Sequence, residues 1–145
     1  MSEKFKVFIA SDHAGFEMKQ KIMRHLRVKN FDLIDRGPDN NESVDYPDYA
    51  KKVASDVFEN ISNKAILICG SGQGMAMVAN RHAGIRAAVC SNPEVAKLAR
   101  AHNDANILTL GARFIDEDMA IKCVDEFFST DFDRDRHMNR VKKIG

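Results

Sequence analysis

The sequence predicts one α/β domain in which helices cover both faces of a five-stranded parallel sheet. Short apolar segments alternate with helical patterns along the whole chain, which is typical of parallel sheets. The 145 residues are enough for one hydrophobic core, and 44% of them are apolar. No internal repeat, linker or low-complexity segment divides the chain. We therefore expect residues 1–145 to form a single doubly wound domain, a Rossmann-like three-layer sandwich.

The strands are predicted where short apolar runs end in polar or glycine-rich segments. The five predicted strands cover residues 6–10, 31–35, 65–69, 85–90 and 106–110. The second strand is the weakest, because Asp32 and Asp35 interrupt its apolar residues. Since parallel strands end at a common edge of the sheet, the residues that follow them are expected to lie together there.

The helices are predicted where apolar residues recur three or four positions apart. They cover residues 16–28, about 46–57, about 73–83, about 93–102 and 115–128, and a charged tail of about 131–145 has a weak helical pattern. Gly84 is the expected C-cap of the third helix, and Ser91 or Asn92 the N-cap of the fourth. Val95, Leu98 and Ala99 are expected on the apolar side of that fourth helix.

Charge and cysteine content exclude several classes of protein. The net charge of +1 gives no overall field that would hold nucleic acid or a membrane surface. The three cysteines, Cys69, Cys90 and Cys123, are an odd number and form no CxxC motif. The start of the sequence does not have the apolar segment of a signal peptide. We therefore expect a protein of the reducing cytoplasm. No His, Cys, Asp and Glu residues have metal-ligand spacing, so no metal is expected.

The most informative stretch is residues 69–74, Cys-Gly-Ser-Gly-Gln-Gly, between the third strand and the third helix. Such a turn points several backbone N–H groups at one spot, where the helix dipole adds partial positive charge, so it suits an anion. The phosphate loops of nucleotide-binding proteins do not match, because no lysine follows Gly74 and the glycine spacing differs from GxGxxG. The alternative is a tight turn without a ligand.

Other reactive side chains follow neighbouring strands. Asp12 and His13 follow the first strand, and Arg113 follows the fifth. A carboxylate here could transfer protons or merely cap the next helix. Cys69, at a helix N-terminus, could supply a thiolate or be an ordinary buried cysteine. Cys90 is interpreted as a core residue, and so is Cys123.

Two further groups lie away from the glycine loop. His102 and Asn103 precede the fifth strand, so they belong to the opposite edge of the sheet, roughly 17 Å from the thiol. Within one chain they would only close a helix, and they could reach the thiol only across a subunit interface. Arg136 and Arg140 are four residues apart and could hold a phosphate, or they could form salt bridges in a solvated tail.

These motifs together resemble type B ribose-5-phosphate isomerase, in a family that also holds galactose-6-phosphate and allose-6-phosphate isomerases. The resemblance covers essentially the whole chain. It is carried, in order, by Ser11–Phe16, Asp45–Pro47, Ile68–Gly74, Gly84–Ala87, His102–Asp104, Gly111–Arg113 and Arg136–Arg140.

The resemblance implies an aldose–ketose isomerase of the non-oxidative pentose phosphate pathway that uses no metal and no organic cofactor. By this resemblance Cys69 is the base that moves a proton between C1 and C2, and Ser71 assists as a hydroxyl acid. Asp12 handles hydroxyl protons, and His102 assists ring opening. The implied substrate-binding residues are His13, Tyr46, Gly70, Gly72, Gly74, Asn103, Arg113, Arg136, His137 and Arg140. Some relatives use a glutamate as base at the position of Met75, so here the role falls to Cys69.

The resemblance also implies a homodimer, or a dimer of dimers, whose active sites lie between subunits. A neighbouring copy would then bring His102 and a tail arginine to the thiol of this chain. Two alternatives stay open at this stage. One is isomerisation of a six-carbon sugar phosphate such as allose 6-phosphate or galactose 6-phosphate. The other is a regulatory module that binds a sugar phosphate without converting it, which would need the phosphate ligands but not Cys69.

Overall fold

The structure is a computed structural model that describes residues 5–145. One parallel sheet of five strands has the order β2-β1-β3-β5-β4. The strands are β1 (Lys6–Ser11), β2 (Asp32–Asp35), β3 (Lys64–Cys69), β4 (Ala87–Val89) and β5 (Ile107–Gly111). The helices are α1 (Phe16–Val28), α2 (Tyr46–Glu59), α3 (Gln73–Ala79), α4 (Pro93–Asn103), α5 (Glu117–Ser129) and α6 (His137–Ile144).

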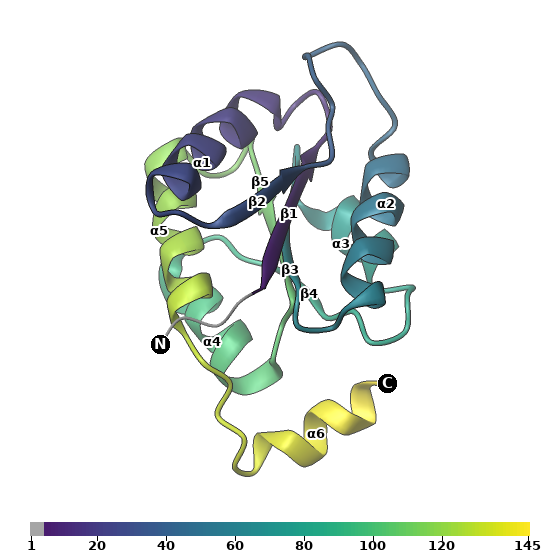
Figure 1. Ribbon diagram of the computed structural model, residues 1–145, viewed down its shortest axis with the longest axis vertical. Helices are drawn as coiled ribbons and strands as arrows, with labels where there is room; N and C mark the ends of the chain where they lie inside the picture. Colours follow the sequence, from purple (N-terminus) through teal and green to yellow (C-terminus); the bar gives the residue numbers. More distant parts are fainter. Residues whose placement is uncertain (1–4) are drawn as a thin grey trace.

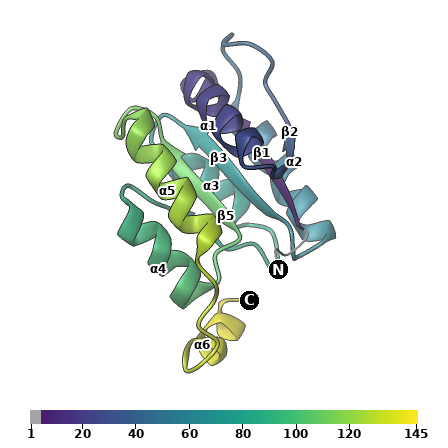
Figure 2. The ribbon, with the colours of Figure 1, turned by 60° about the vertical axis from the view of Figure 1, so that its left-hand side comes forward.

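Helices cover both faces of the sheet, as the sequence predicted. α1, α4 and α5 lie on one face, and α2 and α3 lie on the other (Figures 1 and 2). The central strand β3 shows why both layers form: its residues alternate between the two faces, and nearly all of them are buried. Ile66 and Ile68 pack with the first layer, whereas Leu67 and Cys69 pack with the second. The thiol of Cys69 is therefore on the side of α3.

The helix after the glycine loop is shorter than predicted. It ends at Ala79 with Asn80 as its C-cap, and Gly84 lies in the following turn with φ +77°. The side-chain amide of Asn80 accepts a hydrogen bond from the N–H of Ala87 (2.7 Å) and donates one to the carbonyl of Ala87 (2.9 Å). Because this amide takes the place of a strand partner, the chain leaves the helix early, and β4 is shorter than expected.

Other helix boundaries also differ from the prediction by a few residues. α5 begins at Glu117, because the carboxylate of Asp116 accepts the N–H of Met119 (2.8 Å) and caps it. In the tail, helix forms only from His137 onward. Asn92, one of the two predicted candidates, caps α4 by accepting the N–H of Val95 (2.9 Å). His82, interpreted as a helical residue, lies in the turn after α3.

The outer side of α4 was also predicted incorrectly. Its buried residues are mainly alanines, whereas Val95 and Leu98 remain 40% and 41% exposed. The layer between α4 and the sheet is thin enough that small side chains fill it, which leaves the larger apolar ones outside. None of the helices in residues 5–145 is long and apolar enough to cross a membrane.

Candidate active site

The glycine loop wraps around the thiol of Cys69 at the carboxyl end of β3. The N–H of Gly72 donates to the sulfur of Cys69 (3.2 Å), and the cysteine is only 4% exposed. Gly72 has φ +80°, and a Cβ there would lie 3.1 Å from the carbonyl carbon of Leu110. Glycine is therefore required at this position both for the backbone conformation and for the close approach to β5. The result is a fixed N–H group aimed at the sulfur.

Arg113 adds positive charge beside the loop. Its N–H donates to the carbonyl of Gly70 (3.0 Å), and the N–H of Ala112 donates to the carbonyl of Cys69 (2.9 Å). The guanidinium lies over Gly70, where a Cβ would be 3.1 Å from Nη1 of Arg113. Among the described residues, no carboxylate lies within ion-pair distance of this exposed guanidinium. It is therefore available to an anionic ligand.

The first turn of α2 places Tyr46 on the same loop. A Cβ at Gly74 would lie 2.5 Å from the ring of Tyr46 and 2.8 Å from its hydroxyl oxygen. The absence of a side chain at Gly74 thus makes room for the phenol. Tyr46 is 38% exposed, so its hydroxyl can reach a ligand from outside the domain.

The turn after β1 holds Asp12 beside Cys69. Its N–H donates to the carbonyl of Ile68 (3.0 Å), and a Cβ at Gly15 would lie 2.6 Å from the Ile68 side chain. The Oδ1 atom of Asp12 accepts the N–H of Gly15 (3.1 Å). Gly15 itself is the N-cap of α1, and no side chain within residues 5–145 caps this helix, so Asp12 does not have the capping role that was the alternative to proton transfer. Because a carboxylate has a second acceptor oxygen, the bond to Gly15 leaves Oδ2 for proton transfer.

His13 and Ser71 complete this edge. Nδ1 of the exposed His13 ring accepts the N–H of Val44 (3.3 Å), which comes from the segment before α2. The hydroxyl oxygen of Ser71 accepts the N–H of Gln73 (3.2 Å), so its own proton stays free to be donated. Met75, where some relatives have a glutamate base, is completely buried.

The remaining predicted residues lie at the opposite edge of the sheet, where the strands begin. His102 stacks on His137 with ring centroids 4.3 Å apart and an angle of 17° between the planes. Removal from water lowers the pKa of His137, and neighbouring cationic side chains lower it further. These neighbours are His102, Arg136 and Arg140. In Figure 1, α6 lies below the lower ends of the strands, away from the glycine loop.

The arginines of the tail, Arg136 and Arg140, are not held by salt bridges among the described residues. Within residues 5–145, neither Arg136 nor Arg140 forms an ion pair with a carboxylate. The salt bridges to Asp131, Asp133 or Asp135 that a purely structural tail would make are thus not formed. Both guanidiniums are exposed, as is Asn103 at the end of α4. This edge therefore presents positive charge to solvent or to another molecule.

A partly buried ionic network, which the sequence did not predict, lies beside this second group. Arg100 donates to the carboxylate of Asp104 (2.9 Å) and to the carbonyls of Ala105 (2.7 Å) and Thr130 (3.3 Å). Arg86 donates to the other carboxylate oxygen of Asp104 (3.3 Å). The network joins the end of α4 to the start of the tail. The four-residue spacing of Arg100 and Asp104 was the one signal that could have revealed it.

One chain does not bring the two groups together. β3 is six residues long, and a strand rises about 3.3 Å per residue, so its first and last Cα atoms are separated by roughly 17 Å. Cys69 lies at one end of the sheet, and the His102–His137 stack lies beyond the other, as the sequence predicted.

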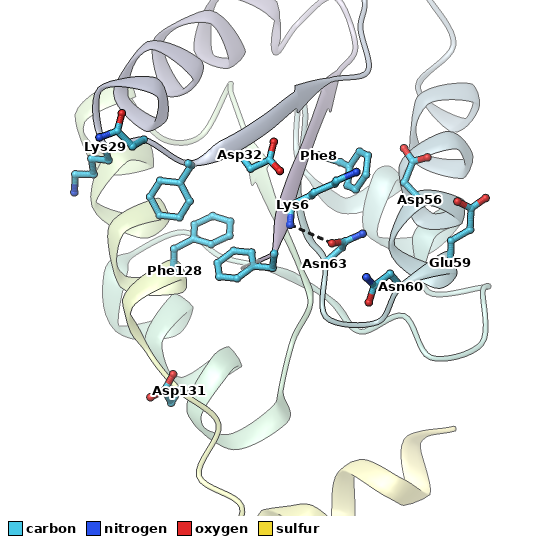
Figure 3. A pocket seen from close by; sticks show the side chains of 13 residues that line it. Lys6, Phe8, Lys29, Asp32, Asp56, Glu59, Asn60, Asn63, Phe128 and Asp131 are labelled. Carbon is cyan, nitrogen blue, oxygen red and sulfur yellow. Dashed lines mark hydrogen bonds between the residues drawn. The ribbon is translucent and has the colours of Figure 1, made fainter. Parts of the chain in front are cut away.

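A broad hollow of about 1120 Å³ contains none of the predicted site residues. It lies where β1 and β2 begin, between the aromatic rings of Phe5, Phe31 and Phe128 and the acidic side chains of α2 (Figure 3). No cluster of three or more His, Cys, Asp or Glu side chains in the described part of the chain could hold a metal ion. The glycine loop therefore remains the best candidate for chemistry.

Known proteins resemble this chain in sequence and in fold. A model of the ribose/galactose isomerase family matches residues 7–144. A crystal structure of Thermotoga maritima ribose 5-phosphate isomerase is 50% identical, with a TM-score of 0.94 over 98% of both chains. Ribose-5-phosphate isomerase B of Mycoplasma genitalium, solved with bound ribulose 5-phosphate, is 42% identical, with a TM-score of 0.96 over 99% of this chain and 95% of that one.

Ribose-5-phosphate isomerase B of Escherichia coli is 41% identical over 139 residues, which are 96% of this chain and 93% of that protein. The family model and these relatives cover the strands, the glycine loop and the tail together. The chain belongs to the ribose/galactose isomerase family.

Proposed function

We propose that the chain interconverts ribose 5-phosphate and ribulose 5-phosphate through an enediolate. The observation that carries this proposal is the thiol of Cys69 held under the N–H of Gly72, in a fold that matches an isomerase solved with bound ribulose 5-phosphate. A sugar-phosphate-binding module without activity would not need a thiol at this place. Burial of Asp12 beside the same loop also favours an enzyme.

The chemistry is a proton transfer between adjacent carbons. In the open-chain aldose, Cys69 removes the proton from C2, and the electrons move onto the carbonyl oxygen at C1 to form the enediolate. Return of a proton to C1 and loss of one from the C2 hydroxyl gives the ketose. The N–H groups of the loop stabilise the developing oxyanion, and one such donor contributes roughly 3 kcal/mol. No metal or organic cofactor is needed for this step.

The remaining residues of the loop edge would handle the hydroxyl protons. Asp12 uses its free Oδ2 to accept and return the proton of a sugar hydroxyl, and Ser71 donates its hydroxyl proton to the substrate. Tyr46 lines the sugar site through its phenol. Gly70 and Gly74 leave room for the side chains of Arg113 and Tyr46, and Gly72 leaves room for the backbone of Leu110, so these glycines would bring the backbone N–H groups and both side chains together around the substrate.

Binding of the substrate's phosphate requires cationic side chains, and only some of the predicted ones lie beside the thiol of Cys69. His13 and Arg113 are at the thiol edge, whereas Arg136 and Arg140 lie at the other edge with His137. We infer that a second copy of the chain supplies the distant group. His102 of that copy assists opening of the sugar ring, and its Asn103 contacts the sugar. The C-terminal tail, about 131–145, would then reach into the partner's site.

Exposed apolar side chains support association of two copies. Met77 follows the glycine loop and is 67% exposed, and Phe114 follows Arg113 and is 77% exposed. Val95 and Leu98 add an apolar strip on α4, the helix that carries His102. Apolar residues this exposed next to a polar site are typical of an interface. A homodimer, or a dimer of such dimers, would cover them and complete the site.

The cellular setting follows from the chemistry of the site. We infer that the protein works in the cytoplasm, in the non-oxidative pentose phosphate pathway. Its three cysteines are free in the structure, and a base that acts as a thiolate requires a reducing compartment. The family name also includes galactose isomerases, so a six-carbon sugar phosphate is the alternative substrate.

Turnover of two substrates tests this proposal. We expect kcat/KM for ribose 5-phosphate to exceed that for allose 6-phosphate by at least about tenfold, because a pocket closed over a five-carbon chain rejects an additional carbon. Coupled assays of the purified protein measure both values. A preference for allose 6-phosphate would indicate the six-carbon alternative. Binding of both sugars without turnover would indicate a regulatory module.

A further inference from the structure

Lys19 is a completely buried lysine that the proposed chemistry does not use. It lies on α1 and is 0% exposed. Its ammonium group donates to Oδ1 of Asp35 (2.7 Å) and to the carbonyl of Pro38 (2.9 Å). The side chain of Asp35 is 27% exposed, so the ammonium group carries most of the cost of burial, and its attraction to Asp35 does little more than offset that cost. Net stability therefore does not explain why a charged side chain is buried here.

Lys19 holds the start of the segment that connects β2 to α2, residues 36–45. The same oxygen of Asp35 also accepts the N–H of Gly37 (2.9 Å). The carbonyl of Gly37 in turn accepts the N–H of Ser11 (3.1 Å), the last residue of β1. The ammonium group is thus the centre of a junction that fixes this segment against the turn that carries Asp12 and His13.

The other end of the segment contacts the site directly. The N–H of Val44 donates to Nδ1 of His13 (3.3 Å), and Tyr46 follows two residues later. A backbone N–H can only donate, so Nδ1 of His13 carries no proton in this arrangement. The neutral ring then carries its proton on Nε2, because the bond at one ring nitrogen determines which tautomer is present. An imidazole in this form presents an Nε2–H donor.

We propose that Lys19 is a positioning residue that keeps His13 in its Nε2–H form. By holding residues 36–45 in place, Lys19 keeps the N–H of Val44 against Nδ1, so that Nε2–H faces the phosphate of the substrate. The proposal rests on the proposed function for the identity of the ligand, but the tautomer itself is independent of it. The same segment determines where Tyr46 begins α2.

A matched control is available on the same helix. Lys21 is two residues away and pairs with Glu117 (3.4 Å) and Asp118 (3.8 Å) on α5. Its side chain is 41% exposed, and its pairs do not involve residues 36–45. Lys21→Met therefore removes the same charge from α1 without loosening the segment. Lys19→Met keeps the length and apolar stem of the buried side chain.

The test combines ¹⁵N NMR of His13 with kinetics. In protein labelled with ¹⁵N-histidine, at a pH of about 8.5 where an ordinary imidazole is neutral, we expect wild type and Lys21→Met to show the Nε2–H tautomer. Lys19→Met should show a mixture of both tautomers. It should also raise KM for ribose 5-phosphate about tenfold, as loss of one oriented hydrogen bond would, and change kcat much less.

The possible failures are distinguishable. Unchanged His13 resonances in folded Lys19→Met would overturn the role of Lys19, whatever the activity. If Lys19→Met shifts the tautomer of His13 but the wild type does not isomerise ribose 5-phosphate, the role of Lys19 stands and the proposed function is overturned. If Lys19→Met does not fold, Asp35→Asn serves as the second variant, since it removes the charged partner at a half-exposed position. The proposal requires the same tautomer shift there, and a wild-type spectrum would contradict it.

Discussion

Replacement of Cys69 by alanine is expected to lower kcat for ribose 5-phosphate about 10³-fold, the usual contribution of a positioned base. The substitution removes the atom that takes the proton from C2, and residues 69–74 and Met75 contain no carboxylate or imidazole that could replace it. Cys69 is small and nearly buried, so alanine leaves the packing largely intact. Steady-state kinetics and circular dichroism measure the two effects separately.

Cys123→Ala is the matched control for this variant. Burial raises the pKa of Cys123 to about 11, and burial together with the nearby Cys123 raises the pKa of Cys90 to about 12. Both therefore remain neutral thiols at pH 7 and lie in the core on the other face of the sheet from the glycine loop. We expect Cys123→Ala to lose about 1 kcal/mol of stability but no activity. Equal turnover by Cys69→Ala and wild type would show that the thiol is not the base.

Mixing two inactive variants is expected to restore activity. Cys69→Ala removes the base from one edge of the sheet, and His102→Ala removes the ring-opening imidazole from the other. If each site combines these edges from two chains, a mixed dimer holds one intact site and one doubly defective site. Random exchange of equal amounts makes about half of all dimers mixed, so about one quarter of wild-type activity should return.

The control for this experiment pairs two residues of the same edge. Asp12 and Cys69 lie in one half-site, so a mixture of Asp12→Ala and Cys69→Ala chains should recover nothing. Denaturation and refolding of the mixture ensures subunit exchange, and ribose 5-phosphate turnover is the measurement. Absence of recovery with His102→Ala, in mixed dimers verified by mass spectrometry, would place His102 and Cys69 in the same chain's site.

The sheet and its layers could be predicted from the sequence because they depend on local patterns. Buried strands such as β3 are short apolar runs, and the helices have apolar residues three or four positions apart. The end of α3 could not be predicted in this way. Gly84 is a reasonable C-cap by composition, but the amide of Asn80 bonds to the backbone of Ala87 and ends the helix earlier. That contact depends on where β4 lies in three dimensions.

The candidate site could likewise be predicted only in part from the sequence. The order of strands predicted which residues lie at each edge, so the separation of Cys69 from His102 was evident before the structure. The bond from Val44 to His13 spans 31 residues, and the contact of Lys19 with Pro38 spans 19. No periodicity in the sequence encodes such contacts, because they form only when separate elements pack together.

Deuterium exchange during turnover tests the central claim, a proton transfer through an enediolate made by Cys69. Wild-type enzyme converting ribose 5-phosphate in D₂O should place solvent deuterium at C1 of the ribulose 5-phosphate formed, and NMR of the product measures it. Cys69→Ala, incubated at high concentration, should form neither the product nor the label. Complete absence of deuterium at C1 after many forward and reverse turnovers of the equilibrium mixture would contradict the enediolate mechanism. Labelled product formed at the wild-type rate by Cys69→Ala would contradict the role of the thiol.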